Sequence, residues 1–302
     1  MKALILAAGF GTRLLPYTNT VPKPLFTLGS IPLLGHIIQL LVRSGCRQII
    51  INTHHLPHLI TDFIANSKEQ FDADIHCIHE PEILNTGGAI ANVKAFMADQ
   101  NFFVINADVA TNVDLAALFD FHKTRNALAT LALHDRKAFN KVAVDPGGWI
   151  TGFNHPGKGL AFTGIQVLSP RIFDLMPDRT VFSSIDLYAD LCKTKQVAAY
   201  VADGIFWEDM GTPDAYARTA RQWMGAAALG TDIQETRIQA LGGDGSDRTW
   251  FRALPVRPPK NNKNPASVVI SDHGICLPGS DTKKQLEAFV HIGTHLFEQK
   301  VP

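Results

Sequence analysis

Short, mainly apolar runs alternate with amphipathic stretches through the first hundred residues. Four such runs are predicted strands: Ala3–Ala8, Gln48–Asn52, Ile75–Ile78 and Phe102–Asn106. Three stretches between them are predicted helices: Ile31–Arg43, Leu59–Ala65 and Ala89–Met97. Strands that are apolar on both faces are typical of parallel sheets covered by helices on either side. We therefore expect an α/β fold with an open, mostly parallel mixed sheet flanked by helices, whose ligands bind at the carboxyl ends of the strands.

The pattern changes after Asp108. Four further strands are predicted, with no long helix between them: Ala127–Leu133, Val142–Val144, Trp149–Phe153 and Phe162–Leu168. They predict a mixed region laid against the main sheet. The remaining predicted elements are helical stretches near Ile172–Met176 and Ile185–Thr194, a strand at Val197–Val201 and a closing helix at Pro213–Met224.

The chain changes character near Gly225–Gly230. The residues beyond this point are rich in glycine and proline, with one short strand-like run at Ser267–Ser271 and a predicted helix at Lys284–Phe297. About 75 residues with so little apolar material are few for an independent core. We expect a main domain over residues 1–226 and a small appendage over residues 227–302.

Composition excludes several classes of function. Lys plus Arg and Asp plus Glu both total 28, so the formal net charge is zero and no global field favours nucleic acid or an anionic membrane. No run approaches the ~20 apolar residues of a membrane span. The four cysteines are scattered and form no C-x-x-C pair, as suits a reducing cytoplasm.

A glycine-containing loop directly follows the first predicted strand. Ala8, Gly9, Gly11 and Thr12 can bring backbone N–H groups close to a phosphate chain. Leu14 occupies the position of the third glycine of a dinucleotide-binding fingerprint, and the Walker sequence is absent. Arg13 and Lys23, the latter in Pro22-Lys23-Pro24, add two cations to the same connection. The alternative is an ordinary glycine turn with surface cations.

The whole stretch Leu6-Ala7-Ala8-Gly9-Phe10-Gly11-Thr12-Arg13-Leu14 … Pro22-Lys23-Pro24-Leu25 resembles the signature of sugar-phosphate nucleotidyltransferases, and the resemblance extends to about Met224. Within that family the chain looks most similar to N-acetylmuramate-1-phosphate uridylyltransferases and to mannose-1-phosphate guanylyltransferase-like proteins. The resemblance implies a nucleoside triphosphate held by the loop and a sugar-1-phosphate that attacks it. Arg13 would lie on the β- and γ-phosphates and Lys23 near the α-phosphate.

The same resemblance implies roles for two further groups. Glu82, Thr86, Gly87 and Gly88 would contact the nucleoside, because Thr-Gly-Gly opening a helix offers free amides and room for a flat base. Thr86 could equally be a helix cap. Asp108, which follows the fourth strand, and Asp209, in Trp207-Glu208-Asp209-Met210-Gly211-Thr212-Pro213, would hold Mg²⁺, while Glu208 has a structural role.

The sugar side is expected at Asn106, Asn154, Thr163 and Gly164. Asn154 and His155 replace the Glu-Lys pair of many relatives, which argues against a plain glucose-1-phosphate enzyme. His54, His55 and His58 are dense enough to suggest zinc, but their spacing lacks the H-E-x-x-H pattern, so we interpret them as a polar loop.

The end of the chain carries a second resemblance. Leu241–Arg252, with Gly242-Gly243-Asp244-Gly245-Ser246, resembles the opening glycine loop of aminoglycoside-phosphotransferase-like sugar kinases, and Phe289–Pro302 resembles the helix leading into that kinase lobe. It implies a functional link to an anomeric sugar kinase. Three rival functions stay open: guanylyl transfer to mannose-1-phosphate, a nucleotide-sugar sensor without turnover, and kinase activity of the tail.

Overall fold

The computed structural model describes residues 1–156, 159–241, 249–257 and 267–272. The chain divides into two compact units. The first unit comprises Met1–Thr12, Pro22–Leu25 and Pro32–Asp209, and the second comprises Arg13–Val21, Phe26–Ile31 and the chain from Met210 onward. The predicted boundary between residues 226 and 227 stays a prediction. One helix, α7 (Pro213–Leu229), runs through that position.

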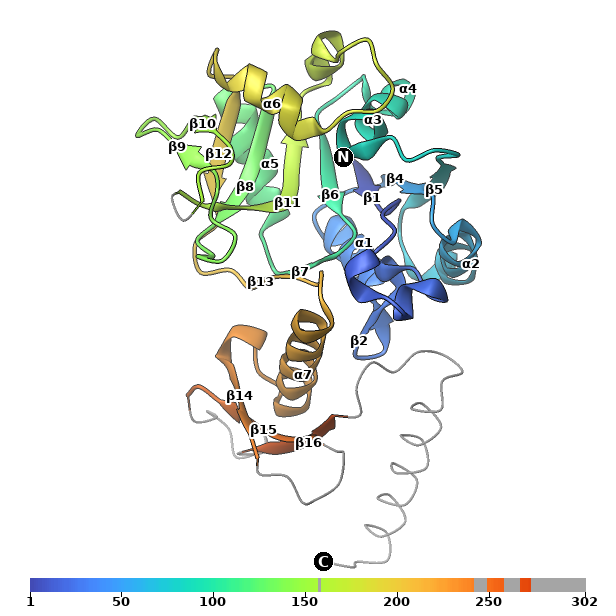
Figure 1. The fold of residues 1–302 in the computed structure, drawn as a ribbon, viewed down its shortest axis with the longest axis vertical. Helices are drawn as coiled ribbons and strands as arrows, with labels where there is room; N and C mark the ends of the chain where they lie inside the picture. Colours follow the sequence, from blue (N-terminus) through green and yellow to red (C-terminus); the bar gives the residue numbers. More distant parts are fainter. Residues whose placement is uncertain (157–158, 242–248, 258–266, 273–302) are drawn as a thin grey trace, which may run out of the picture. The chain divides into compact units, whose positions relative to one another are not determined.

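A seven-stranded sheet forms the centre of the first unit, in the order β12-β8-β11-β6-β1-β4-β5 (Figure 1). The strands are β1 (Lys2–Leu6), β4 (Gln48–Thr53), β5 (Asp74–His79), β6 (Phe102–Asn106), β8 (Ala129–His134), β11 (Ala161–Leu168) and β12 (Val197–Val201). β5, β4, β1 and β6 run parallel, β11 is antiparallel to both of its neighbours, and β12 is parallel to β8. The predicted open, mostly parallel mixed sheet is confirmed.

The register of the parallel strands brings their carboxyl ends to one edge. Leu6 at the end of β1 is level with Asn52 on β4 and with Asn106 on β6. The segments that follow these strands therefore begin side by side, although they lie far apart in the sequence. This edge is where an open α/β sheet binds its ligands.

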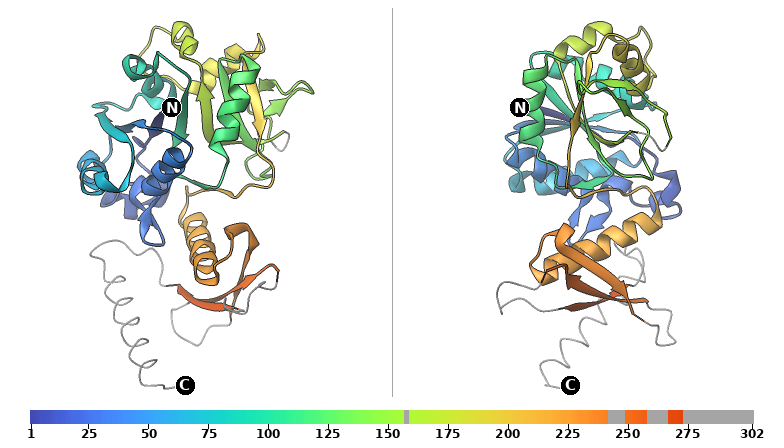
Figure 2. Two further views of the ribbon diagram at one scale, coloured as in Figure 1. Left: turned by 180° about the vertical axis from the view of Figure 1, so that it is seen from behind. Right: turned by 90° about the vertical axis from the view of Figure 1, so that its left-hand side faces the viewer.

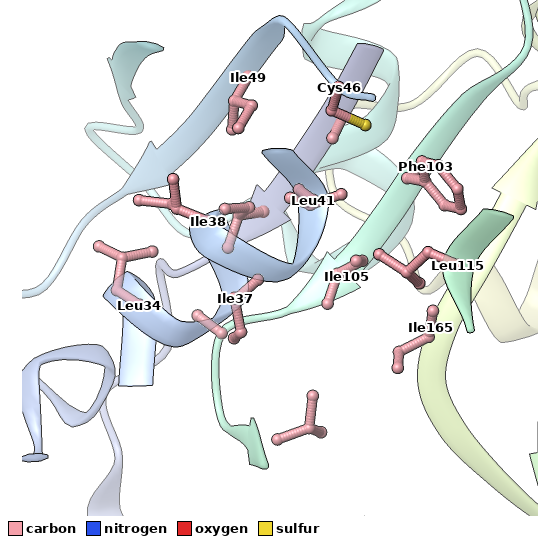
Figure 3. Packing of buried hydrophobic residues seen from close by; sticks show 14 of the residues in the cluster. Leu34, Ile37, Ile38, Leu41, Cys46, Ile49, Phe103, Ile105, Leu115 and Ile165 are labelled. Carbon is pink, nitrogen blue, oxygen red and sulfur yellow. The ribbon is translucent and has the colours of Figure 1, made fainter. Parts of the chain in front are cut away.

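Helices cover both faces of the sheet (Figure 2). One face packs against α1 (Leu33–Arg43), α2 (Pro57–Ser67) and α5 (Leu115–Arg125). Figure 3 shows this core, where Ile37 and Leu41 of α1 lie over the sheet near Ile105 of β6. The other face packs against α3 (Asn85–Asn92), α4 (Lys94–Met97) and α6 (Ser184–Cys192). Two buried faces explain why the strands are apolar at consecutive positions.

The region after Asp108 differs from its prediction. β8 and β11 are members of the main sheet, where we expected strands laid against it. Only β9 (Ala143–Val144) and β10 (Ile150–Gly152) of the predicted strands form a separate pair. The prediction was wrong because single-sequence patterns show which segments are strands but not which strands pair.

Some helices also differ from the prediction. α5 was not predicted, although Asp114 caps it by accepting from the Ala117 amide and Asn126 ends it in the left-handed region, at φ 49°. The stretch predicted as a helix near Ile172–Met176 is a 3₁₀ helix over Pro170–Leu175. None of the helices in the described part of the chain is long and apolar enough to cross a membrane.

In the second unit, α7 packs on a three-stranded antiparallel sheet of β14 (Thr236–Ala240), β15 (Thr249–Pro255) and β16 (Val268–Asp272). Leu229, Ala253 and Ile270 form its small buried core. The sequence predicted only β16 among these strands. The Tyr216 hydroxyl donates to the Thr27 carbonyl in β2 (Thr27–Leu28) over 2.7 Å. The predicted helix Lys284–Phe297 lies outside the described residues.

Candidate active site

Asp108 and Asp209 lie close together at the carboxyl edge of the sheet, although they belong to different elements. Asp108 follows β6 directly. The next strand, β7 (Val109–Thr111), pairs antiparallel with β13 (Trp207–Asp209), and this register sets Asp209 opposite Val109. The short β7–β13 pair therefore brings together two carboxylates that are distant in the sequence.

Lys23 lies between these carboxylates. Its Nζ donates to Asp108 Oδ2 over 2.6 Å and lies 3.7 Å from Asp209 Oδ1. The Lys23 side chain is only 8% exposed, whereas those of Asp108 and Asp209 are 32% and 19% exposed. A buried ammonium requires such partners, because desolvation of an unpaired charge is costly. The cation is thus fixed in place while both carboxylates stay open to a ligand.

The arrangement suits Mg²⁺. Two carboxylates and one ammonium leave a net negative charge, which favours a further cation. Mg²⁺ is commonly held by one or two carboxylates together with substrate phosphates and water. The predicted ligands Asp108 and Asp209 provide that donor set. Their neighbour Glu208 instead forms an ion pair with Arg136, in keeping with a structural role.

No larger metal cluster is present in the part of the chain that the structure describes: no group of three or more His, Cys, Asp or Glu is arranged to hold a metal ion. The His54 ring is engaged with protein groups. Its Nδ1 donates to the Glu80 carbonyl over 2.8 Å, and the Phe10 ring meets it edge-on with centroids 5.2 Å apart.

The glycine loop begins where β1 ends. Ala8 is buried, and Gly9 is exposed with no atom within 4 Å of the position that a Cβ would occupy. Gly11 has φ 65°, a left-handed conformation that glycine adopts without strain. Thr12 is exposed at the start of a 3₁₀ turn. Gly9 therefore leaves space beside the loop backbone that an approaching phosphate could occupy.

Arg13 belongs to the second unit, in which its guanidinium packs against Gly211. A Cβ added to Gly211 would lie 2.5 Å from Arg13 Nη2, so a side chain at this position would displace the guanidinium. Thr212, the next residue, caps α7 by accepting from the Ala215 amide. The role of Arg13 toward phosphates stays a prediction.

The Thr-Gly-Gly segment is more tightly packed than the sequence suggests. The Gly87 and Gly88 amides donate to the Phe182 carbonyl over 2.9 and 3.2 Å, so they are not the free amides we expected. A Cβ on Gly87 would overlap the Phe182 ring at 2.4 Å, which explains glycine there by packing alone. The Thr86 hydroxyl accepts from the Ser184 amide over 2.9 Å and does not cap its own helix.

Asn85 and Glu82 precede this segment in the sequence. Asn85 has φ 58°, and asparagine tolerates this left-handed conformation better than most residues. Glu82 is exposed. The assignment of Glu82, Thr86, Gly87 and Gly88 to the nucleoside stays a prediction.

On the sugar side, the structure brings Asn106 and Gly164 into close contact. Gly164 has φ 78°, and a Cβ there would lie 2.7 Å from Asn106 Nδ2. The Thr163 hydroxyl donates to the Ala132 carbonyl over 2.8 Å, and the Trp207 indole donates to the Thr163 carbonyl over 2.9 Å. The buried Thr163 side chain is thus bonded to β8 and its carbonyl to β13, and the sugar contact at Thr163 stays a prediction. Asn154 is exposed on the loop after β10.

Two buried polar residues at the same edge were missed by the sequence reasoning. Asn52, on β4, is 3% exposed, and Glu80, just after β5, is 1% exposed. They are joined to each other and to the glycine loop by hydrogen bonds. The signal in the sequence was a polar residue at the end of each of two neighbouring predicted strands, where a buried polar group is costly unless it is paired.

The sheet has a glycine loop after its first strand, and two carboxylates and a lysine lie at its carboxyl edge. Together these features define a nucleotide-transferring class of protein. The family model described as "Nucleotidyl transferase" matches residues 2–224. The chain belongs to the nucleotidyl transferase family.

Curated relatives agree with this assignment. A mannose-1-phosphate guanylyltransferase of Mycobacterium tuberculosis is 30% identical over 260 residues, covering 82% of this chain and 71% of that protein. A mannose-1-phosphate guanyltransferase of Schizosaccharomyces pombe is 29% identical over 227 residues, covering 72% of this chain and 62% of that protein. The chain therefore spans about two thirds of the length of these relatives.

Among solved structures, UDP-glucose pyrophosphorylase from Acinetobacter baumanii matches with a TM-score of 0.63. The match covers 75% of this chain and 93% of that one, at 20% sequence identity. At this identity the likeness supports the fold alone.

Proposed function

We propose that the chain is a sugar-1-phosphate nucleotidyltransferase, which joins a nucleoside triphosphate to a sugar-1-phosphate and releases pyrophosphate. The observation that carries the proposal is Lys23 Nζ held between the carboxylates of Asp108 and Asp209, at the edge where the glycine loop begins. Family membership supports the same reaction class.

In this reaction an oxygen of the sugar-1-phosphate attacks the α-phosphorus of the triphosphate. A P–O bond forms as the bond to the pyrophosphate oxygen breaks. The attacking phosphate is already ionised at neutral pH, so no strong general base is needed. The protein's part is to position the two phosphates and to neutralise charge. Lys23 would face the α-phosphate, and the amides of Gly9 and Gly11 would contact the phosphate chain.

Mg²⁺ is the proposed cofactor, held by Asp108 and Asp209 together with phosphate oxygens of the substrate. Bound there, it would neutralise charge on the phosphates and draw their oxygens into place. The ion pair would keep Lys23 in position beside the carboxylates before a nucleotide arrives.

The first candidate pair of substrates is UTP with N-acetylmuramate-1-phosphate, a reaction of cell-wall recycling, on the resemblance of the sequence. The alternative is GTP with mannose-1-phosphate, and the names of the relatives from M. tuberculosis and S. pombe favour it. We also propose a cytoplasmic location, where the triphosphate and reduced thiols are both found. Cys46, Cys77 and Cys192 are free thiols.

The kinase-like resemblance of the tail has one supporting observation. β14 and β15 pair antiparallel and flank the glycine-rich segment in the sequence, as the strands around a kinase glycine loop would. The segment itself, residues 242–248, lies outside the described residues. A kinase that phosphorylates the anomeric hydroxyl would supply the sugar-1-phosphate that this reaction consumes.

A panel assay tests the proposal. Pyrophosphate release is measured with UTP, GTP, ATP and dTTP, each against N-acetylmuramate-, mannose- and glucose-1-phosphate, with and without Mg²⁺. We expect Mg²⁺-dependent release with one pair well above all others. No release with any pair, despite measurable nucleotide binding, would contradict the proposal and favour a nucleotide-sugar sensor.

A further inference from the structure

A chain of three hydrogen bonds crosses the carboxyl edge of β1, β4 and β5. The Ala7 amide donates to Asn52 Oδ1 over 2.7 Å, and Asn52 Nδ2 donates to Glu80 Oε1 over 2.8 Å. The other carboxylate oxygen, Glu80 Oε2, accepts from the Leu84 amide over 3.2 Å. The Asn52 and Glu80 side chains are almost completely buried. We call this chain of contacts the Asn52–Glu80 relay.

The direction of every bond in the relay is fixed by its two ends. The amides of Ala7 and Leu84 can only donate. Asn52 must therefore turn its oxygen toward Ala7 and its NH₂ group toward Glu80. Glu80 must then accept on both sides, which an ionised carboxylate does and a neutral amide does not. The donor pattern accounts for a carboxylate at this buried position.

The burial of Glu80 carries an energetic cost. No Lys or Arg forms an ion pair with Glu80 within the described ranges. A buried charge without a counter-charge is costly, even when it accepts two hydrogen bonds. Apolar side chains at these positions would avoid that cost, but they would leave the amides of Ala7 and Leu84 without these acceptors.

The two ends of the relay lie in the two segments proposed to bind the nucleotide. Ala7 is the residue before Ala8 and Gly9, where the phosphate-binding loop begins. Leu84 is the N-cap residue of α3, the helix that opens with Asn85 and Thr86. Several helices and strands separate these two segments in the sequence. The side chains of Asn52 and Glu80 nevertheless link them directly through hydrogen bonds.

We propose that Asn52 and Glu80 are positioning residues for the nucleoside triphosphate: they fix the spacing between the glycine loop and the start of α3. This inference rests on the proposed function, because it assigns the nucleotide to these two segments. It predicts that disturbing the relay weakens nucleotide binding more than sugar-phosphate binding.

Three variants test the inference through the direction of the bonds. In Glu80→Gln, one NH₂ group of the relay must face another donor in every arrangement. In Asn52→Asp, two carboxylates meet. The double variant Asn52→Asp with Glu80→Gln restores all three bonds. The carboxylate introduced at position 52 accepts from the Ala7 amide and from the NH₂ group introduced at position 80, whose amide oxygen accepts from Leu84. The double variant also conserves the net charge.

The measurements are the Kd of UTP and of GTP by calorimetry with Mg²⁺, and KM and kcat for both substrates of the active pair. Each single variant is expected to raise Kd and KM for the nucleotide about 10-fold, with KM for the sugar phosphate changed less than about 2-fold. In the double variant, Kd and KM for the nucleotide are expected to lie within about 3-fold of the values for the unmodified protein. Asp74→Asn, at an exposed position at the other end of β5, is the matched control. It should leave Kd and KM for the nucleotide and KM for the sugar phosphate unchanged.

Two outcomes would overturn the inference. One is unchanged nucleotide binding in folded single variants. The other is a double variant that melts like the unmodified protein but binds nucleotide as weakly as the single variants. If a single variant does not fold, Asn52→Ala takes its place, since it breaks the relay without opposing like groups. Calorimetry needs no turnover, so failure of the proposed reaction and failure of the relay are separately visible.

Discussion

Lys23 Nζ and Asp108 Oδ2 lie 2.6 Å apart, although 85 positions separate the two residues in the sequence. The contact joins the 3₁₀ turn after the glycine loop to the end of β6. Asp209 completes the group through β13. A chain with no net charge thus gathers three charged groups at the edge of its sheet where ligands bind.

The two aspartates should control the requirement for Mg²⁺. In Asp108→Asn and Asp209→Asn, the Mg²⁺ concentration that gives half-maximal pyrophosphate release is expected to rise at least about 10-fold, because each change removes an anionic ligand. Titration of Mg²⁺ at saturating substrate checks this. Glu208→Gln is the control, since Glu208 pairs with Arg136, and its titration curve should match that of the unmodified protein. Identical curves for all three variants would remove the metal assignment.

The sequence predicted the ingredients of this site better than its geometry. The glycine loop, Lys23 and both aspartates were found because they occupy short, recognisable motifs. The antiparallel pairing of β7 with β13, which sets Asp209 beside Asp108, depends on strands of three residues that carry no periodic signal. The amides of Gly87 and Gly88 were expected to be free because local sequence does not reveal that Phe182, about 95 positions later, occupies them.

The fold was predictable to a similar degree. Strands buried on both faces were found, since a continuous apolar run is a strong signal. α5 was missed because its apolar residues do not form a clear stripe, and only Leu115, Leu118 and His122 of that helix are buried. The order of the strands in the sheet could not be predicted, because a single sequence does not show which distant segments pair.

Two glycines should respond to alanine in opposite ways. Gly164→Ala forces a left-handed conformation on alanine and sets its Cβ against Asn106, so we expect a loss of about 2 kcal/mol of folding free energy. Gly9→Ala meets no neighbouring atom and should change stability by less than about 0.5 kcal/mol. Urea unfolding measures both changes.

The same pair separates stability from binding. Gly9→Ala should raise KM for the nucleotide, because its methyl group occupies the space beside the loop backbone that a phosphate would approach. Equal effects of the two substitutions on stability, or an unchanged nucleotide KM in Gly9→Ala, would contradict this description of the loop.

His122 should make the protein sensitive to mild acid. Burial lowers the pKa of its imidazole to about 4 from an ordinary value of 6.5, and its Nδ1 lies 2.8 Å from Thr130 Oγ1. Between pH 6.5 and 4 the unfolded chain binds a proton that the folded chain excludes. The stabilisation is therefore complete above pH 6.5 and is lost as the pH falls toward 4.

As the pH falls from about 7 to about 5, the buried His122 should lower the free energy of unfolding by about 2 kcal/mol. The free energy of unfolding of His122→Gln, compared with that of the unmodified protein at both pH values, isolates the effect. The unmodified protein should lose more stability than the variant over this interval. Parallel losses in the two proteins would mean that His122 is not the group responsible.

The most direct test of the account is pyrophosphate release by Lys23→Ala with the best substrate pair and saturating Mg²⁺. Lys2→Ala, which breaks an ion pair with the exposed Asp99, is the matched loss of one lysine outside the site. If Lys23 stabilises charge at the reacting phosphate, its removal should lower kcat about 100-fold or more in a protein that stays folded by circular dichroism, while Lys2→Ala retains full activity. Release at the unmodified rate by folded Lys23→Ala would contradict the account.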